Sequence, residues 1–258
     1  VNYPMNSIKY HIDAVKKTFQ ELFKGNYLIF FIPGAVLTVI YLLFSYHTSL
    51  VAETFLLDAD NSWTGWAKGI HNSGVESIFD FFGFMVDQIY IFATITLLSP
   101  FNTVLSERLD TQLTGTKYNS SIARFINDII RMVFIVIIAV TLEISFLVFY
   151  YIISLIFGLA VIDGFMFFVI AAFFYGMAFY DFALERDQAG VFGTLGFAFS
   201  KPIFMILTGS IFLIIYSIPL IGVPISPVIT VMVSTIVYLY ITKKIPKQTE
   251  LKTTENNE

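Results

Sequence analysis

The stretch ITLLSPFNTVLSERLD, from Ile95 to Asp110, ends a long apolar run and begins a half-polar segment. Pro100 lacks a backbone N–H and disfavours helical dihedral angles at the preceding Ser99. The stretch therefore predicts that the helix beginning near Ile78 kinks or ends here, and that Ser99 caps a new helix. A bent helix that carries charged residues at the edge of the membrane costs free energy to form, which points to a function.

The composition is typical of an integral membrane protein. Of the 258 residues 57% are hydrophobic and 13% are charged, whereas a soluble domain carries about 25% charged residues. The chain has no Cys, which excludes disulfides, thiolate metal sites and cysteine nucleophiles, and its three His lack metal-ligand spacing. A net charge of −4 leaves no basic footprint for nucleic acid. We expect no metal and no nucleic-acid partner.

No catalytic pattern accompanies this composition. The sequence has no Ser-His-Asp order, no phosphate-binding Gly-rich loop and no cofactor fingerprint. The Gly-rich stretch GVFGTLG at 190–196 lacks the Lys-Thr and the preceding strand of a phosphate-binding loop. Its small residues instead predict a close approach between helices. We therefore expect a protein that is not an enzyme and binds no cofactor.

Residues 1–24 predict an amphipathic helix that lies on the membrane surface. Apolar side chains recur at helical spacing, and four lysines lie among them. A helix that packs against another part of the protein is the alternative. The apolar positions are Ile8, Ile12, Val15, Phe19, Leu22 and Phe23.

Residues 25–242 predict a single transmembrane domain, and the polar tail at 243–258 is typical of disorder. The first apolar run, 27–46, is long enough to cross ~30 Å of hydrocarbon, and Pro33 should bend it. Polar loops are expected at 47–77 and 107–128. The later apolar runs cover residues 78–98, 132–159, 165–184, 203–221 and 228–241, of which the last four form two hairpins.

The turn GVPISP in the last hairpin, from Gly222 to Pro227, carries no charge and precedes a run that is short for a full crossing. Gly222, Pro224 and Pro227 of this turn each predict a kink in the chain. The hairpin either enters the bilayer part-way or crosses it with a tight extracellular turn. Non-helical backbone at depth must face water or protein, so a part-way hairpin implies a polar path or an oligomer.

The fold class that follows is an all-α integral membrane protein. It combines the amphipathic N-terminal helix with two long bent transmembrane helices and two helical hairpins that either cross the membrane or re-enter it. With this arrangement, fourteen of the fifteen Lys and Arg lie on one side of the membrane. The positive-inside rule makes that side cytoplasmic, so both termini are expected inside a multi-pass inner-membrane protein.

Four charged residues are candidates for a transport pathway. Glu143 lies deep in an apolar run, where a carboxylate must be protonated, paired or facing water. The same argument applies to Asp87 and, outside these four, to Asp181. Glu107 and Arg108 either line the cytoplasmic mouth of a path or are exposed residues at a helix end.

Six features recur in an order and spacing that carry a resemblance to a known family. They are FKGNYLIFFIP at 23–33, SPFNTVLSERLD at 99–110, Arg124 with Asp128, Tyr180 with Asp181, 193–199 with Pro202, and PLIGVPISPV at 219–228 followed by Ser234-Thr235. Together they resemble the CysZ-type sulfate permease family, part of the etoposide-induced protein 2.4 superfamily. The resemblance covers about residues 12–242. It implies long bent helices, hairpins that enter part-way, and a homo-oligomer around a path for sulfate.

The resemblance also implies an anion site at the start of the first span. In that family, backbone amides and an arginine hold the anion at a Gly-Leu-Arg sequence. The matching positions here are Gly25, Asn26 and Tyr27, so a tyrosine replaces the arginine. Lys24 adds a positive charge, and the free N–H groups of a helix start favour an anion. A plain helix cap beside a snorkelling lysine is the alternative.

We therefore expect a channel or permease that moves sulfate or a related small anion across the inner membrane without ATP, surrounded by membrane lipid. The alternative is a non-conducting scaffold of the same fold that organises lipid or envelope. A transport path predicts that Glu143, Asp87 and Lys24 converge on one water-accessible cavity. A scaffold predicts that these residues are separately paired.

Overall fold

The computed structural model describes residues 3–24, 27–40, 42–43, 73–118, 122–187 and 189–245, and its elements there are all helical. A helical segment at 31–40 follows η1. Most of the predicted loop at 47–77 and of the polar tail lies outside these residues. The elements are α1 (Tyr3–Lys24), η1 (Tyr27–Phe30), α4 (Ser73–Thr114), α5 (Ile122–Phe157), η2 (Ala160–Ile162), α6 (Asp163–Leu184), η3 (Glu185–Asp187), α7 (Val191–Ser200), α8 (Pro202–Tyr216) and α9 (Gly222–Ile241).

Within the described part of the chain, four helices are long and apolar enough to cross a membrane, and they belong to α4, α5, α6 and α9. Two bent helix pairs raise the number to as many as six. One pair joins Asn6–Lys24 to Tyr27–Ile40 at 105°, and the other joins Val191–Ser200 to Pro202–Tyr216 at 97°. The protein is therefore an all-helical, multi-pass membrane protein, as the composition predicts.

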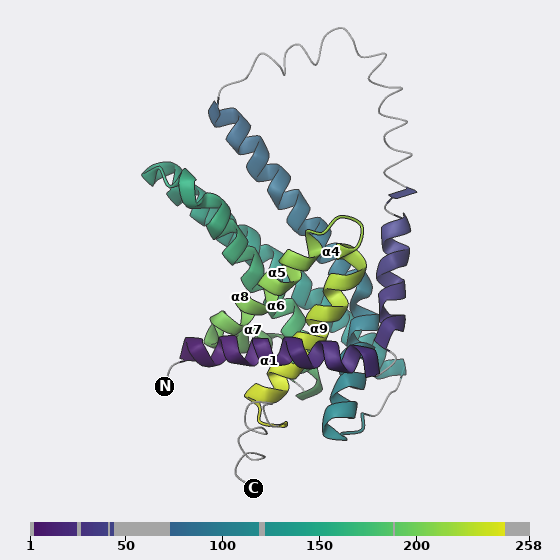
Figure 1. Ribbon diagram of the computed structural model, residues 1–258. Coiled ribbons are helices and arrows are strands. Elements are labelled where there is room, and N and C mark those ends of the chain that lie inside the picture. Colours follow the sequence, from purple (N-terminus) through teal and green to yellow (C-terminus); the bar gives the residue numbers. More distant parts are fainter. Residues whose placement is uncertain are drawn as a thin grey trace.

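Helix α9 forms the centre of the bundle. It contacts α8, α4, α1 and α6, and 83% of its spanning window is buried, against 33% for α5 and for α6. Figure 1 shows α9 among these neighbours, while the α5–α6 hairpin projects from the bundle. The core thus lies around α9, and the outer faces of α5 and α6 are left for lipid.

Helix α1 lies across α8 and α9 (Figure 1). The face that it turns toward them is mostly small and polar, and its buried residues are Ser7, His11, Ala14, Thr18 and Leu22. The exposed stripe is apolar and contains Ile8, Ile12, Phe19 and Phe23. An apolar stripe turned away from the protein is what a surface helix presents to lipid. The packing of α1 against α8 and α9 is therefore confirmed, and its position on the membrane surface stays a prediction.

Helix α4 corrects the prediction for the stretch 95–110. It runs without interruption from Ser73 to Thr114 with Pro100 inside it, so Pro100 does not end the helix and Ser99 does not cap a new one. Proline within a transmembrane helix is tolerated when neighbouring helices and side chains compensate the lost hydrogen bond. The predicted loop at 107–128 is likewise shorter, because α4 reaches Thr114 and α5 begins at Ile122.

The last hairpin also differs from its prediction. The turn lies before Gly222, and the GVPISP residues form the first turns of α9. Gly222 and Pro224 lie in its first turn, and Pro227 lies inside the helix, where the kink stays a prediction. Proline is tolerated in the first turn because its missing N–H has no partner there. Similarly, Pro33 lies within the helical segment at 31–40, and the large bend precedes it.

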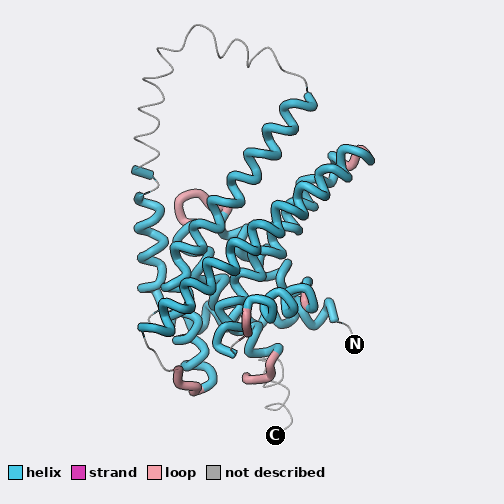
Figure 2. Tube along the Cα trace, turned by 180° about the vertical axis from the view of Figure 1, so that it is seen from behind, coloured by secondary structure: helices cyan, strands magenta, loops and turns pink. Residues whose placement is uncertain are grey.

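The depth of this hairpin follows from the lengths of its two helices. Helix α9 has 20 residues, enough for a crossing, whereas the 15 residues of α8 span only about 22 Å of the ~30 Å hydrocarbon core. In Figures 1 and 2 the α8–α9 turn lies lower than the tip of the α5–α6 hairpin. Together with α7, α8 forms a bent pair that is either a broken span or a re-entrant loop.

Helices α6 and α8 approach each other at two glycines. A Cβ on Gly176 would lie 2.0 Å from the Met205 carbonyl oxygen, and a Cβ on Gly209 would lie 1.8 Å from that of Ala172. Small residues allow such contact between membrane helices. The Gly-rich stretch 190–196 was expected to do this and does not, because two of its three glycines have nothing within 4 Å.

Candidate functional site

Polar side chains follow one buried face of α4 toward its C-terminal end. Each is at most 8% exposed, and their spacing of three or four residues places them on one side of the helix. Burying so many polar groups in a membrane helix is costly unless they have partners. The residues of this stripe are Ser99, Asn102, Thr103, Ser106 and Asp110.

An ion pair closes the stripe. Arg186 Nε of η3 lies 2.8 Å from Asp110 Oδ2, and both side chains are 1% exposed. Tyr118 OH donates to the same oxygen at 2.7 Å, and Thr114 Oγ1 donates to Asp110 Oδ1 at 3.0 Å. Burial and the hydrogen bond to Asp110 raise the pKa of Tyr118, so its hydroxyl remains a donor.

Ser106 ties the ion pair to the central helix. Its Oγ accepts a hydrogen bond from Arg186 Nη1 and lies 2.6 Å from Thr235 Oγ1 of α9. Among the described residues, four polar atoms of this region have no hydrogen-bond partner: Arg186 Nη2, Arg186 Nε, Asn102 Nδ2 and Ser99 Oγ. Of these, Arg186 Nε faces Asp110 in the ion pair. The stripe therefore retains buried hydrogen-bonding capacity that the described part of the chain does not use.

A second cluster joins α1, η1 and α4 at the start of the first span. The Tyr27 side chain is buried, and its hydroxyl donates to Gln112 Oε1 at 2.6 Å. Gln112 Nε2 in turn donates to Glu21 Oε2 at 2.6 Å. The Arg108 guanidinium lies over the Tyr27 ring, with Cζ 5.5 Å from its centroid. The guanidinium of Arg108, which belongs to α4, thus lies beside the tyrosine at position 27.

The remaining residues of the predicted anion site are only partly visible. Lys24 is exposed at the last position of α1. Gly25 and Asn26 lie outside the described residues. Of the four predicted positions, the structure therefore places Lys24 and Tyr27, and it brings Tyr27 together with Arg108.

The pathway candidates belong to two helices, α4 and α5. Glu107 is half-buried and Arg108 exposed in the last turns of α4. Glu143 is completely buried in α5, and neither carboxylate oxygen has a hydrogen-bond partner among the described residues. Asp87 belongs to α4, but its side chain lies outside the described part. Because neither oxygen of Glu143 has a hydrogen-bond partner among the described residues, no hydrogen bond joins Glu143 to Lys24 there. The convergence of these two residues with Asp87 stays a prediction.

Asp181, flagged as an isolated charge, has partners on two other helices. Arg131 Nη2 of α5 lies 2.6 Å from Asp181 Oδ1 and donates to Thr194 Oγ1 of α7 at 3.2 Å. Thr194 Oγ1 donates to the same carboxylate oxygen at 2.7 Å. This pairing, like that of Asp110 with Arg186, joins residues far apart in the chain. Only the four-residue spacing of Ser106 and Asp110 signals a shared face in the sequence.

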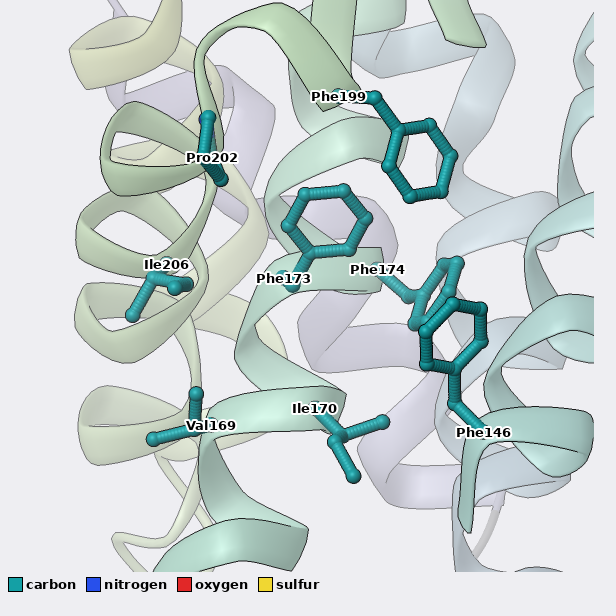
Figure 3. A pocket seen from close by; sticks show the side chains of 8 residues that line it. All are labelled: Phe146, Val169, Ile170, Phe173, Phe174, Phe199, Pro202 and Ile206. Atoms are coloured by element: carbon teal, nitrogen blue, oxygen red, sulfur yellow. The ribbon is translucent and has the colours of Figure 1, made fainter. Parts of the chain in front are cut away.

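A cavity of about 230 Å³ lies between α5, α6, α7 and α8. Figure 3 shows its lining, which contains apolar side chains alone and none of the predicted site residues. It is therefore not the polar path that transport would need. Its lining residues are Phe146, Val169, Ile170, Phe173, Phe174, Phe199, Pro202 and Ile206.

Known proteins offer no relative for comparison with these clusters. No protein-family model, no curated protein and no solved structure matches this chain. The resemblance in the sequence and the geometry of the polar clusters are the grounds for a function.

Proposed function

We propose that the protein is a channel or permease that moves sulfate or a related small inorganic anion across the inner membrane without ATP. The observation that carries this proposal is the position of Arg108. Its guanidinium lies over Tyr27, at the start of the first span, where the resembled family has an arginine. A side chain from another helix thus supplies the missing cation at the same place.

The side chains around Tyr27 and Arg108, at the start of the first span, suit the binding of an oxyanion. A guanidinium offers parallel N–H donors to two oxygens of a sulfate-like ion, which an ammonium cannot reproduce. Lys24 is exposed close by in the sequence, and Lys17 is near enough to Glu21 and Lys24 to interact with both charges. With Glu21 as the acidic member, the cluster remains net positive and attracts anions to the membrane surface.

The stripe on α4 offers a continuation toward the interior. Ser99 Oγ, Asn102 Nδ2 and Arg186 Nη2 are buried without a hydrogen-bond partner among the described residues. Buried donors usually have partners, and a passing oxyanion or its water would provide them. We place the anion first at Arg108 and then along this face, in a homo-oligomer whose neighbouring copies complete the path.

Sulfate uptake into proteoliposomes tests the proposal. Radioactive sulfate should enter vesicles that contain the wild-type protein, and Arg108→Ala should lower uptake roughly tenfold, the loss expected for a charge-assisted hydrogen bond. Lys24→Ala should lower it less, because its ammonium is a point charge. Lys117→Ala is the matched control, since this exposed cation lies in the loop after α4 and should leave uptake unchanged.

Two results would contradict the proposal. Uptake no greater than in empty vesicles, from folded and inserted protein, would exclude sulfate transport. Equal uptake by Arg108→Ala and Lys117→Ala would remove the anion site from the start of the first span.

A non-conducting membrane scaffold is the second candidate. The scaffold hypothesis predicts separate pairing of Glu143, Asp87 and Lys24. What supports it is that two other buried acids, Asp110 and Asp181, are each paired with an arginine. The cavity between α5 and α8 is apolar and offers no water-filled path. Lack of flux for sulfate and for other small anions would favour this role.

A further inference from the structure

The guanidinium of Arg186 is buried but uses only part of its hydrogen-bonding capacity. The side chain is 1% exposed, and Nη1 donates to Ser106 Oγ and, at 3.0 Å, to the Phe182 carbonyl oxygen. Nη2 has no hydrogen-bond partner among the described residues. A buried N–H group without a partner costs free energy, so an acceptor that reaches Nη2 would stabilise the protein.

The ion pair with Asp110 does not saturate this guanidinium. Arg186 Nε lies 2.8 Å from Asp110 Oδ2, yet Nε makes no hydrogen bond within the described part of the chain. The contact therefore lacks the two parallel hydrogen bonds that make arginine–carboxylate pairs strong. Because desolvation of both charges offsets their attraction, such a buried pair adds little net stability. Another oxyanion can thus compete with the Asp110 carboxylate for the guanidinium.

A second buried donor lies on the same face of α4. Asn102 precedes Ser106 by one helical turn, and the Cβ atoms of residues at this spacing lie about 5–6 Å apart. The Asn102 side chain is buried, and its Nδ2 has no hydrogen-bond partner among the residues that the structure describes. Since Arg186 Nη1 reaches Ser106, the guanidinium and the amide offer donors on the same side of the helix.

The chemistry of these donors indicates the class of ligand. Arg186 Nη2 and Asn102 Nδ2 both donate, so the ligand must supply acceptor atoms, and a guanidinium binds a charged oxygen more strongly than a neutral one. The neighbouring acid Asp187 is paired with Lys244 at 2.7 Å and accepts a hydrogen bond from Tyr238. Asp187 is therefore not an uncompensated negative charge that would repel an anion.

We propose that Arg186 Nη2 and Asn102 Nδ2 form an inner binding site for a small oxyanion, and that Asp110 competes with this anion for Arg186. The inner site deepens the proposed function and rests on it, because the anion that enters at Arg108 continues along α4. Competition by Asp110 allows the anion to leave again.

Sulfate should stabilise a variant that has lost the competing carboxylate. Asp110→Asn leaves the Arg186 guanidinium buried without a counter-ion, which bound sulfate would replace. At sulfate concentrations about a hundredfold above its dissociation constant, the unfolding temperature of this variant should rise by roughly 5–10 °C relative to sodium chloride of equal ionic strength. Full-length protein in detergent is used for this comparison.

The double variant Asp110→Asn with Arg186→Met is the matched control. It has no guanidinium at the inner site, so sulfate should change its unfolding temperature only through the general salt effect that both proteins share. The difference between the two proteins therefore reports sulfate bound at Arg186.

A variant of Asn102 keeps the test valid if Asp110→Asn fails to fold. Asn102→Leu nearly preserves the shape but removes the donor, and it should weaken binding of radioactive sulfate about tenfold. Thr94→Val is the matched control, because the buried Thr94 hydroxyl already donates to the Tyr90 carbonyl at 3.1 Å. Both are made in an Arg108→Ala background, so that binding at the start of the first span does not contribute.

The outcomes separate the inner site from transport itself. Stabilisation of Asp110→Asn by sulfate, without sulfate uptake by the wild-type protein, would support the inner site and contradict the permease. Equal effects of sulfate on Asp110→Asn and on the double variant would overturn the inner site, even if the wild-type protein transports sulfate. Equal sulfate binding by Asn102→Leu and Thr94→Val would overturn it as well.

Discussion

At the scale of single residues, Asp110 and Arg186 form an ion pair that is buried within the bundle. Both side chains are almost entirely removed from solvent, and Tyr118 and Thr114 complete the shell of Asp110. The desolvation of two such charges offsets much of their attraction, so the pair adds little stability over an apolar one. Removal of one partner, however, leaves a buried charge without compensation.

Arg186→Met should therefore destabilise the protein by about 3–5 kcal/mol. The double variant Asp110→Asn with Arg186→Met should recover a large part of this loss, because it removes both charges. Thermal unfolding in detergent measures the difference. If the single variant unfolds at the wild-type temperature, Asp110 does not depend on Arg186.

A second residue-scale prediction concerns the docking of α1. His11 Nδ1 donates to the Ser7 carbonyl at 2.8 Å, and Nε2 lies 2.9 Å from Thr208 Oγ1 of α8. Burial lowers the pKa of His11 from its ordinary 6.5 to about 4. Since the undocked helix binds the proton more readily, docking is complete above pH 6.5 and weakens as the pH falls toward 4. The total loss is at most about 3 kcal/mol.

Spin labels can follow this release, because the chain contains no native Cys. Labels at Ile8→Cys on α1 and Ile214→Cys on α8, both exposed, should show a broader distance distribution at pH 4.5 than at pH 7. His11→Phe cannot be protonated and should remove the change between these pH values. A change of the same size in both proteins would assign it to another group.

At the scale of the elements, the contact between α6 and α8 depends on backbone approach. The space beside Gly176 and Gly209 is occupied by carbonyl groups of the opposite helix, which cannot move aside as a flexible side chain can. The two helices also form walls of the apolar cavity between α5, α6, α7 and α8. Their separation therefore affects the width of that cavity.

Gly209→Ala should destabilise the protein by about 1–3 kcal/mol or more, since the added methyl group forces the helices apart. Gly196→Ala is the matched control, because a Cβ there meets nothing within 4 Å and alanine is the better helix former. Unfolding temperatures of the two variants make the comparison. Equal temperatures would contradict the close packing of α6 on α8.

At the scale of the whole molecule, the arrangement of the helices agrees with a single orientation. The start of α1 and the end of α9 lie at the same end of the bundle in Figures 1 and 2. The α5–α6 tip projects at the other end, where Val161 is 98% exposed. From the positive charges, the positive-inside rule predicts that the first of these ends is cytoplasmic.

Labelling of single introduced cysteines in intact cells tests this orientation. A thiol reagent that does not cross the membrane should modify Val161→Cys, whereas Lys117→Cys should react only after permeabilisation. Ile218→Cys in the α8–α9 turn should react more slowly than Val161→Cys if this hairpin enters part-way. Labelling of Lys117→Cys in intact cells would reverse the orientation.

The sequence by itself determined the class of the protein and the approximate positions of its membrane helices. Composition indicates whether a chain is surrounded by water or by lipid. A long apolar run such as 165–184 predicts a transmembrane helix from its own residues, without information from any other segment. The amphipathic helix at the N-terminus could be predicted because its periodic pattern is local. Its contact face could not be predicted, because nothing in the local sequence marks Ser7 or His11 as a contact with α8 and α9.

Only the tertiary structure decided which polar groups meet. Arg108 reaches Tyr27, Arg186 reaches Asp110, and each pair joins helices whose relative placement no local pattern encodes. The structure also overruled local propensity at Pro100, because packing against α9 and the neighbouring helices stabilises α4 through the proline. Helix pairing is a property of the packed bundle, and it brings Arg108 to Tyr27 and encloses the apolar cavity between α5, α6, α7 and α8.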